Sequence, residues 1–446
     1  MQQDTGFSER MVSMELNEIK QRISDAVSQN SEEICAFGDE VLAMPELGYK
    51  ERNTSRHFEQ RLEQLGLVPQ HFAGTGLKAC LGGRTDGPCV GIIGELDAVS
   101  CFGHPNANGE TGAAHACGHN AQQASAYGAI LALIRSGVMQ ELDGSVALLA
   151  TPAEEFLDME YRMQLRQEGK IEYFGGKQQM ILEGAFDGVD LAMMLHAHPD
   201  TPGAALNLDG ESLGFTAKTI DFYGRAAHGS KPFEGINALN AAMLGLMGIH
   251  ANREIFRDED HIRIHPIITN GGSVVNSVPD HVRIETYIRG ANADAIANAC
   301  QVVDRSINGA AMTIGAKAEI ATVPGYLPLR QDEALGRVME QNAVALWGGD
   351  SIHRGVPTTG STDIGDLSHL IPCIQPTFGG FSGALHSREF RIVDKKLAYL
   401  DSARLLAMTA ADLLFGGAAP AGAICSAFRP VFSKQEYLDF LRSQWK

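Results

Sequence analysis

Apolar and polar positions repeat along this chain with two different periods, and each period predicts one kind of element. Apolar residues at steps of three and four over 13–42 predict one long helix that ends before Pro45. Nearly continuous apolar runs at 89–95 and 145–150 predict central strands that are covered on both faces. The same patterns predict further helices at 53–65, 121–136, 236–256, 291–312, 395–415 and 433–445, and further strands at 78–81, 191–195, 217–223, 262–269, 282–289 and 317–323. Between these elements we expect an Asp143-Gly144 turn and a linker rich in Gly, Ala and Pro at 416–424.

The order of the predicted elements divides the chain into an α/β domain and an insert. Over 213–324 the order is β-α-β-β-α-β, which is typical of a ferredoxin-like sandwich. The pattern on either side of the insert indicates an α/β/α domain with a mixed sheet. We therefore expect the α/β domain to occupy 1–212 and 325–415, and a C-terminal extension to follow at 416–446.

Composition narrows the class of protein. The 446 residues exceed one ordinary domain, and 44% hydrophobic with 20% charged residues is a globular composition. A formal net charge of -18 argues against nucleic acid and anionic membrane surfaces as partners. Eight cysteines without a CxxC pair predict reduced thiols in a cytoplasmic protein. We find no secretion signal at the start of the chain and no apolar run long enough to span a bilayer.

The stretch HACGHN at 115–120 concentrates groups that can bind metal. Cys117 and His119 stand two residues apart, and His115 precedes them. A thiolate and an imidazole are ligands for zinc and its neighbours in the transition series. The stretch alone is only suggestive, because a site also needs ligands from other parts of the chain.

Predicted strands lead directly into such further groups. Asp97 follows the first apolar run, Glu154 and Glu155 follow the second, and His196 and His198 follow the strand at 191–195. Sites in open α/β sheets form at the carboxyl ends of the strands. We therefore expect separate segments to deliver polar side chains to one edge of one sheet.

Each of these residues also has an ordinary structural explanation. Paired acids such as Glu154-Glu155 are favoured at an exposed helix start by the helix dipole. A lone histidine at a strand end, as at His196, is commonly only hydrogen-bonded there. His386 in a glycine-rich stretch and His228 would each be loop histidines if they stood alone. Arg289, at a strand end, can pair a substrate carboxylate or form a surface ion pair.

Taken together, the segments resemble the M20 metallopeptidase/amidohydrolase family, in particular its amidohydrolase branch. That branch includes aminobenzoyl-glutamate hydrolases, hippurate and indoleacetyl-amino-acid hydrolases, and M20-domain dipeptidases. The matching motifs stand in family order up to about residue 415, and they are PELGYKE (45–51), GELDA (94–98), HACGHN (115–120), PAEE (152–155), LHAHP (195–199), GRAAHGSKPFEGINAL (224–239), NSVPD (276–280) and GSTDIGDLSHLIP (360–372), with His386 beyond them.

The resemblance implies that the α/β domain is catalytic and holds two divalent metal ions, zinc or manganese, with cobalt also tolerated. Cys117 matches the bridging thiolate, and the other protein ligands match His119, Glu155, His196 and His386. Glu154 matches the general base, and Asp97 matches an aspartate that orients a ligating histidine.

The resemblance also assigns the insert as a lid and dimerisation domain, and so implies a homodimer. His228 matches the lid histidine that, in dimeric members, reaches a neighbouring subunit's site and steadies the oxyanion. Asn276 and Arg289 match lid positions that hold the carboxylate end of a substrate.

The implied activity is hydrolysis of the amide bond of an N-acyl amino acid or related small amide, by a metal-bridged water with Glu154 as base. The alternative is a dipeptidase acting on small dipeptides, for example β-alanyl ones, with a free amino group. A metal-binding protein without catalysis would have no use for Glu154. A cysteine nucleophile at Cys117 would leave the Glu154-Glu155 pair unexplained.

Two segments depart from the family pattern. HACGHN ends in Asn120, where many branch members carry aspartate. With GSTDIGD, this favours the subgroup that resembles aminobenzoyl-glutamate hydrolase and the dipeptidase-like proteins. After PAEE, a charged and helix-prone segment at 156–170 replaces the usual glycine-rich run. We expect this segment to be a specificity insert beside the site, with a surface excursion as the alternative.

Overall fold

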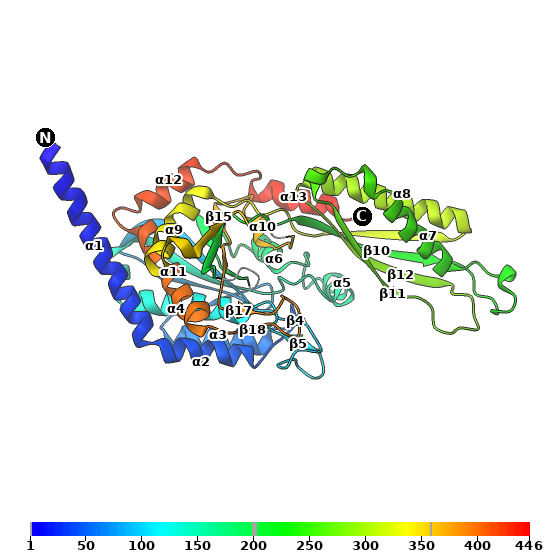
Figure 1. Ribbon diagram of the computed structural model, residues 1–446, viewed down its shortest axis with the longest axis horizontal. Coiled ribbons are helices and arrows are strands. Elements are labelled where there is room, and N and C mark those ends of the chain that lie inside the picture. The colour runs from blue at the N-terminus through cyan, green and yellow to red at the C-terminus, as the bar shows by residue number, and fades with distance from the viewer. Residues whose placement is uncertain (1, 199–202, 357–358) are drawn as a thin grey trace. The chain divides into compact units, whose positions relative to one another are not determined.

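The computed structural model describes residues 2–198, 203–356 and 359–446, which form a mixed α/β fold (Figure 1). The α/β class predicted from the sequence is therefore confirmed. Pro199, the last residue of the LHAHP motif, lies outside the described residues. The chain divides into two compact units: unit 1 is Met1–Glu211, Arg330–Pro357 and Leu367–Val431, and unit 2 is Ser212–Leu329, Thr358–Asp366 and Phe432–Lys446.

Unit 1 is built around a six-stranded sheet with the strand order β1-β2-β6-β3-β7-β15. Its strands are β1 Gln70–Phe72, β2 Gly76–Gly82, β3 Thr85–Glu95, β6 Asp143–Thr151, β7 Leu191–Met193 and β15 Cys373–Ile374. The β6, β3, β7 and β15 strands run parallel, whereas β1 and β2 are antiparallel to their neighbours. Glu95 and Thr151 pair at the carboxyl ends of β3 and β6, so the residues that follow them start at the same sheet edge.

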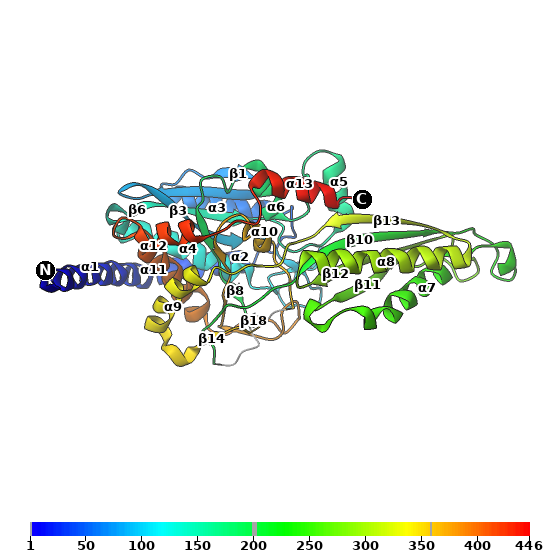
Figure 2. The same cartoon turned by 90° about the horizontal axis from the view of Figure 1, so that it is seen from above.

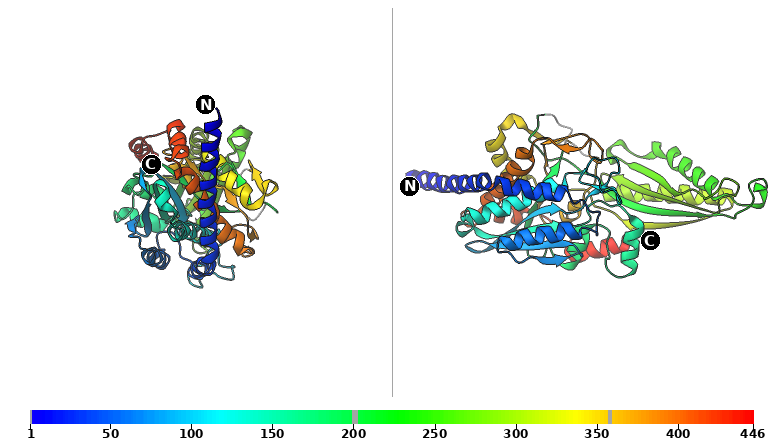
Figure 3. Two further views of the ribbon diagram at one scale, coloured as in Figure 1. Left: turned by 90° about the vertical axis from the view of Figure 1, so that its left-hand side faces the viewer. Right: turned by 90° about the horizontal axis from the view of Figure 1, so that it is seen from below.

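Unit 1 also contains helices, some of them on the sheet and others packed on those helices. They are α1 Gln2–Gln29, α2 Ser31–Leu42, α3 Arg52–Gln64, α4 His119–Arg135, α5 Met159–Gln167, α6 Gly176–Glu183, α9 Glu333–Trp347, α11 Ser402–Leu414 and α12 Ala419–Ala427. The α4 helix is buried from His119 to Leu133, because it packs on β3 and is itself covered by α1, α2 and α11. Figure 3 shows α1 on the outside of unit 1. The helix that carries His119 is therefore a core element of unit 1.

Short strands complete unit 1. A second sheet has the order β14-β9-β16-β8, and two further pairs join β4 with β5 and β17 with β18. Their bounds are β4 Val99–Ser100, β5 Ala113–Ala114, β8 His196–Ala197, β9 Leu206–Leu208, β14 Ile352–Arg354, β16 Thr377–Phe378, β17 Phe381–Ser382 and β18 Arg391–Ile392.

Three local predictions were wrong. The helix expected over 13–42 is two helices, because the Asn30 side chain donates to the carbonyl of Ala26 and competes with the helical backbone. The expected Asp143-Gly144 turn is the start of β6, where Asp143 is held by Arg84. The expected linker at 416–424 contains most of α12, since its alanines favour helix.

Unit 2 contains a four-stranded antiparallel sheet with the order β11-β12-β10-β13. Its elements follow the chain order β10 Gly214–Tyr223, α7 Ala238–Ala251, β11 Arg263–Asn270, β12 His281–Gly290, α8 Ala293–Ile314 and β13 Lys317–Pro324. The two helices pack on each other and cover one face of the sheet (Figure 2). The tail helix α13, Lys434–Gln444, contacts β13 within the same unit.

Across the described residues, no single helix has the length and apolar composition needed to cross a membrane. One pair of segments, Lys396–Leu414 and Ala419–Ala427, meets that criterion only when the two are taken together across a bend of 85°. The α11 part of this pair is buried throughout.

Candidate metal centre

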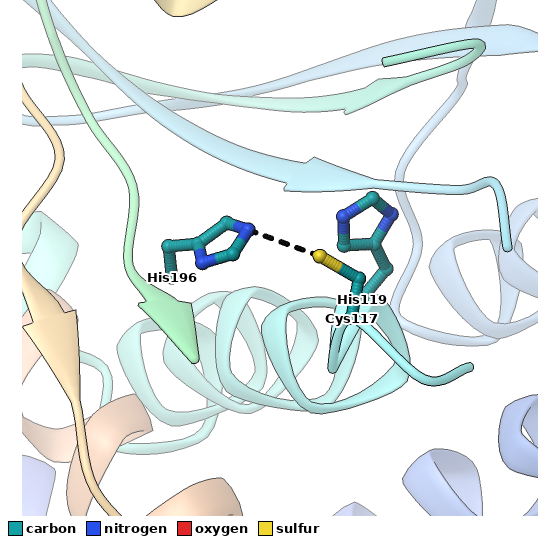
Figure 4. A group of neighbouring side chains, drawn as sticks. All are labelled: Cys117, His119 and His196. Atoms are coloured by element: carbon teal, nitrogen blue, oxygen red, sulfur yellow. Dashed lines mark hydrogen bonds between the residues drawn. The ribbon is translucent and has the colours of Figure 1, made fainter. Parts of the chain in front are cut away.

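One residue in the left-handed conformation sets the directions of Cys117 and His119. Gly118 between them has a φ of 81°, and α4 begins at His119. A side chain at position 118 would place its Cβ 2.6 Å from the Cβ of Ala197. Only glycine satisfies both the backbone angle and this close contact, and the turn directs the thiol and the imidazole into one region (Figure 4).

His196 reaches this pair from β8. The Cys117 Sγ lies 3.4 Å from the His196 Nε2, and Figure 4 shows this contact beside the His119 ring. One ligand atom from each of the three side chains lies within 4.8 Å of the others. The structure thus brings together a thiol and two imidazoles that the sequence had singled out.

Cys117 also belongs to a second group, with Glu155 and His386. The His386 Nε2 lies 3.3 Å from the Cys117 Sγ and 3.0 Å from a Glu155 carboxylate oxygen. The His386 backbone N–H donates to the carbonyl of Ala116, which ties this distant segment to the Cys117 stretch. Half of the His386 side chain is exposed, so this group is the more open of the two. The Cys117 sulfur is therefore common to both groups.

A third group contains Glu154, Glu95 and His119, all of them buried. The sequence had singled out Glu154 and His119, but not Glu95. The Glu95 carboxylate lies 3.1 Å from the His119 Nε2 and 2.6 Å from the Nζ of Lys177 on α6. The sequence feature that could have identified Glu95 is its position at the end of a predicted strand, two residues before Asp97. Nothing in the local pattern pointed to Lys177.

Asp97 holds two parts of the site. Its backbone carbonyl lies 2.8 Å from the His119 Nδ1, and one carboxylate oxygen lies 3.3 Å from the same nitrogen. Its other carboxylate oxygen accepts a 2.9 Å hydrogen bond from the Glu155 N–H. These contacts leave the His119 Nε2 to face the cluster, and the orienting role of Asp97 stays a prediction.

The surroundings of the cluster favour ionised ligands. Burial and the Glu155 carboxylate oppose ionisation of the Cys117 thiol, but His196 and His119 outweigh them and hold its pKa at about 6. Burial also raises the pKa of Glu155. The opposing effect of His386 is larger and keeps the pKa of this carboxyl below its usual range. Metal binding requires a thiolate and a carboxylate, which is the state that these neighbours stabilise.

The donor set fits divalent transition metals. The buried His119 Nε2 faces the cluster and, within the part of the chain that the structure describes, has no hydrogen-bond partner, despite its proximity to Glu95. A buried ring nitrogen without a hydrogen bond is costly, and a metal ion would satisfy it. One thiolate, imidazoles and carboxylates suit zinc and also accept manganese or cobalt. Among the described residues, His115 and His198 belong to none of the three groups.

The remaining predicted residues lie in unit 2 and are described within it. His228 is exposed, its Nδ1 lies 2.7 Å from the Ser230 hydroxyl, and its backbone pairs with Ser277 next to Asn276. Arg289 donates to the Ser361 hydroxyl at 2.6 Å. The sequence had treated the GSTDIGD loop that contains Ser361 as a separate feature.

The pattern of residues along the chain was compared with known families. The model of peptidase family M20/M25/M40 matches residues 91–409, which is more than half of the chain. The chain belongs to this family. The resemblance inferred from the motifs is thereby confirmed.

Individual relatives of the M20 chain span most of its length. It is 28% identical to the Xaa-Arg dipeptidase of Homo sapiens, over 90% of each chain. It is 24% identical to one subunit of the p-aminobenzoyl-glutamate hydrolase of Escherichia coli (strain K12), over 88% of this chain and 80% of the relative. A solved Bacillus subtilis structure, described as a dinuclear metal binding peptidase of family M20, has a TM-score of 0.64 at 22% identity and covers 86% of this chain and 98% of that one.

Family membership establishes the type of reaction. The M20 chain is a hydrolase that acts on amide or peptide bonds, as its relatives include both a hydrolase of an aminobenzoyl amide and a dipeptidase.

Proposed function

We propose that this M20 hydrolase uses two divalent metal ions to cleave the amide bond between an acyl or aminoacyl group and an amino acid. The observation that carries the proposal is the shared Cys117 sulfur, which belongs to two ligand groups at once. Cys117, His119, Glu155, His196 and His386 would hold the ions. When bound, the ions lower the pKa of a water molecule and polarise the scissile carbonyl.

Glu154 is the proposed general base. It is 6% exposed and lies within 4.8 Å of Glu95 and His119 by ligand atoms, next in sequence to the ligand Glu155. In this role it accepts the proton of the attacking water and returns it to the departing amine. Asp97 keeps the His119 ring oriented during this exchange.

Unit 2 is the proposed lid and dimerisation domain, and its β-α-β-β-α-β order supports a ferredoxin-like sandwich. His228 would steady the oxyanion, and Asn276 and Arg289 would hold the substrate's carboxylate. Their support is the motif positions, the pairing of the His228 and Asn276 segments, and the exposure of His228. We also propose that the enzyme is a homodimer.

Two substrate classes remain as candidates, an N-acyl amino acid and a dipeptide with a free amino group. The Xaa-Arg dipeptidase relative, aligned over 90% of both chains, specifically favours the dipeptide. A screen of zinc- and manganese-reconstituted protein against paired substrates separates them. Each pair has one amino acid, arginine or glutamate included, linked either to a free aminoacyl group or to its N-acetylated form. Turnover of only the free form identifies a dipeptidase.

The base is tested by Glu154→Gln, with Glu155→Gln as the matched control one residue away. We expect Glu154→Gln to retain bound metal and lose turnover, because the amide cannot accept the proton. Glu155→Gln should lose metal as well. Wild-type turnover by Glu154→Gln would contradict the assignment of the base.

Metal identity and location are also proposals. The thiolate favours zinc, while the imidazole and carboxylate ligands accept manganese or cobalt. All eight cysteines are free, which supports a reducing, cytoplasmic environment.

A further inference from the structure

Helix α5, within the segment 156–170, carries a buried arginine, Arg162. Arg162 is 1% exposed, and no carboxylate within the described parts of the chain forms an ion pair with it. The Tyr49 and Phe156 rings lie 5.4 and 5.6 Å from its guanidinium carbon. Burying a charge is costly unless hydrogen bonds compensate it. The partners of this guanidinium therefore indicate what it does.

The hydrogen bonds of Arg162 go to backbone carbonyls around the proposed catalytic pair. Its Nη1 donates to the carbonyl of Ala153 at 3.3 Å and to that of Phe174. Its Nη2 donates to the carbonyl of Glu155. Two of the three carbonyls thus belong to the residue before Glu154 and the residue after it.

The same two residues are held from their N–H groups by buried acids. The Ala153 N–H donates to Glu51 at 2.8 Å, and the Glu155 N–H donates to Asp97 at 2.9 Å. Ala153 has a φ of 53°, a conformation that costs about 1 kcal/mol for a residue other than glycine. A strained loop of this kind persists only where the surroundings fix it. Arg162 bonds both carbonyls, which also accept from the backbone N–H groups of Gly176 and Leu157.

We propose that Arg162 is a positioning residue that fixes the backbone on both sides of Glu154, and that segment 156–170 supports this loop. The inference rests on the proposed function, because Arg162 acts through Glu154 and Glu155. Displacing a reacting group by about 1 Å lowers turnover by roughly 100-fold. Residues that orient metal ligands change metal affinity by about 10- to 100-fold.

The test uses Arg162→Met, which keeps an unbranched apolar stem without the donors, and Arg162→Lys, which keeps the charge but loses the planar fork. Lys50→Met is the matched control. Lys50 anchors the same helix through a 2.6 Å ion pair with Asp158, and both side chains are about two-fifths exposed. It makes none of the bonds to the loop.

Three measurements are made on each full-length variant. Zinc affinity of the metal-free protein is measured by competition with a chromophoric chelator. Amide hydrogen exchange is followed in the peptide 151–157, with the α4 peptide 119–135 as an internal reference. The kcat and KM values are determined on the best substrate from the screen.

We expect Arg162→Met to lower zinc affinity by about 10-fold or more, to speed exchange in 151–157, and to lower kcat by about 100-fold with KM nearly unchanged. Arg162→Lys should fall between Arg162→Met and the unchanged Lys50→Met. Exchange in 119–135 should stay constant, since the effect is local.

Wild-type zinc affinity and exchange in Arg162→Met would overturn the proposal, and the same result in Arg162→Lys would overturn it if Arg162→Met does not fold. Equal losses in Lys50→Met would assign the effect to the helix as a whole and also overturn it. If zinc affinity and exchange change as expected but the wild type cleaves no amide, the proposed function fails while the positioning role stands.

Discussion

Removing Lys177 tests a buried ion pair at the edge of the metal centre. The Lys177 Nζ lies 2.6 Å from Glu95, and both side chains are 0% exposed. Burial raises the pKa of Glu95, but Lys177 and then His119 reverse this and keep the carboxyl ionised. In Lys177→Met the carboxylate keeps a 2.9 Å hydrogen bond from Gln122 and the His119 ring at 3.1 Å, but it loses the Lys177 ammonium.

Removing one partner of a buried pair destabilises a protein by about 3–5 kcal/mol, because the other charge remains uncompensated. We expect a loss at the lower end of this range for Lys177→Met in metal-free protein, because His119 stays beside Glu95. The double variant Glu95→Gln/Lys177→Met removes both charges. Its free energy of unfolding should therefore be at least about 1 kcal/mol higher than that of Lys177→Met. Lys78→Met is the control, because this buried lysine donates to the backbone carbonyl of Asp187 and forms no ion pair with a carboxylate of the described chain. Its loss should cost about 1 kcal/mol.

The two tryptophans make the assay specific to one unit. Trp347 lies in unit 1 and Trp445 in unit 2. In a Trp445→Phe background, the fluorescence of Trp347 reports urea unfolding of unit 1. A loss below about 1 kcal/mol in Lys177→Met, or a double variant no more stable than Lys177→Met, would refute the reasoning.

Four further results are expected. Chelator treatment should abolish turnover, zinc, manganese or cobalt should restore it, and indifference to chelator would contradict the metal centre. Gly118→Ala should destabilise unit 1 and weaken zinc binding, because the added Cβ would collide with Ala197. Gly66→Ala is the control, with the same φ of 81° but open space around it, and it should lower the free energy of urea unfolding by only about 1–2 kcal/mol. Burial raises the pKa of Asp221, but Arg283 and His281 lower it overall. The ionised carboxylate therefore stabilises unit 2 above about pH 4, and this stabilisation is lost below that pH. Asp221→Asn should lower the urea midpoint of unit 2 at neutral pH, and the difference from the wild type should shrink in acid. Mixing His228→Ala with Glu154→Gln subunits should restore part of the activity if His228 acts across a dimer, and absence of recovery would favour action within one chain.

Local patterns were sufficient for the elements that carry the centre. The apolar runs gave β3 and β6, and the strand-end rule predicted that Asp97, Glu154 and His196 would converge with Cys117. The structure places Glu154, His196 and Cys117 in three neighbouring groups, and Asp97 accepts a hydrogen bond from the N–H of Glu155 beside them. The resemblance added His386, whose glycine-rich surroundings alone would not have distinguished it. The ligand and base roles themselves stay predictions.

Long-range polar pairs could not be read from the sequence. Glu95 and Lys177 are separated by 82 residues and meet only because α6 packs beside the sheet. Arg162 stands in the charged segment that we expected to be a specificity insert, with a surface excursion as the alternative. Its guanidinium turns inward to backbone carbonyls that no pattern of side chains reveals. The break between α1 and α2 was also missed. It depends on the bond from the Asn30 side chain to the carbonyl of Ala26, and the periodic pattern does not reveal that bond.

Cys117 is synthesised well before one of the residues that share its sulfur. Its partner His386 is made 269 residues later, so at usual translation rates the thiol is present for on the order of tens of seconds before that second group can close. During synthesis the nascent chain can offer only the earlier ligands, and the complete pair of sites exists only once the C-terminal part has joined unit 1. In the proposed two-metal site, loading of the full metal complement would therefore be a late event in the maturation of this enzyme.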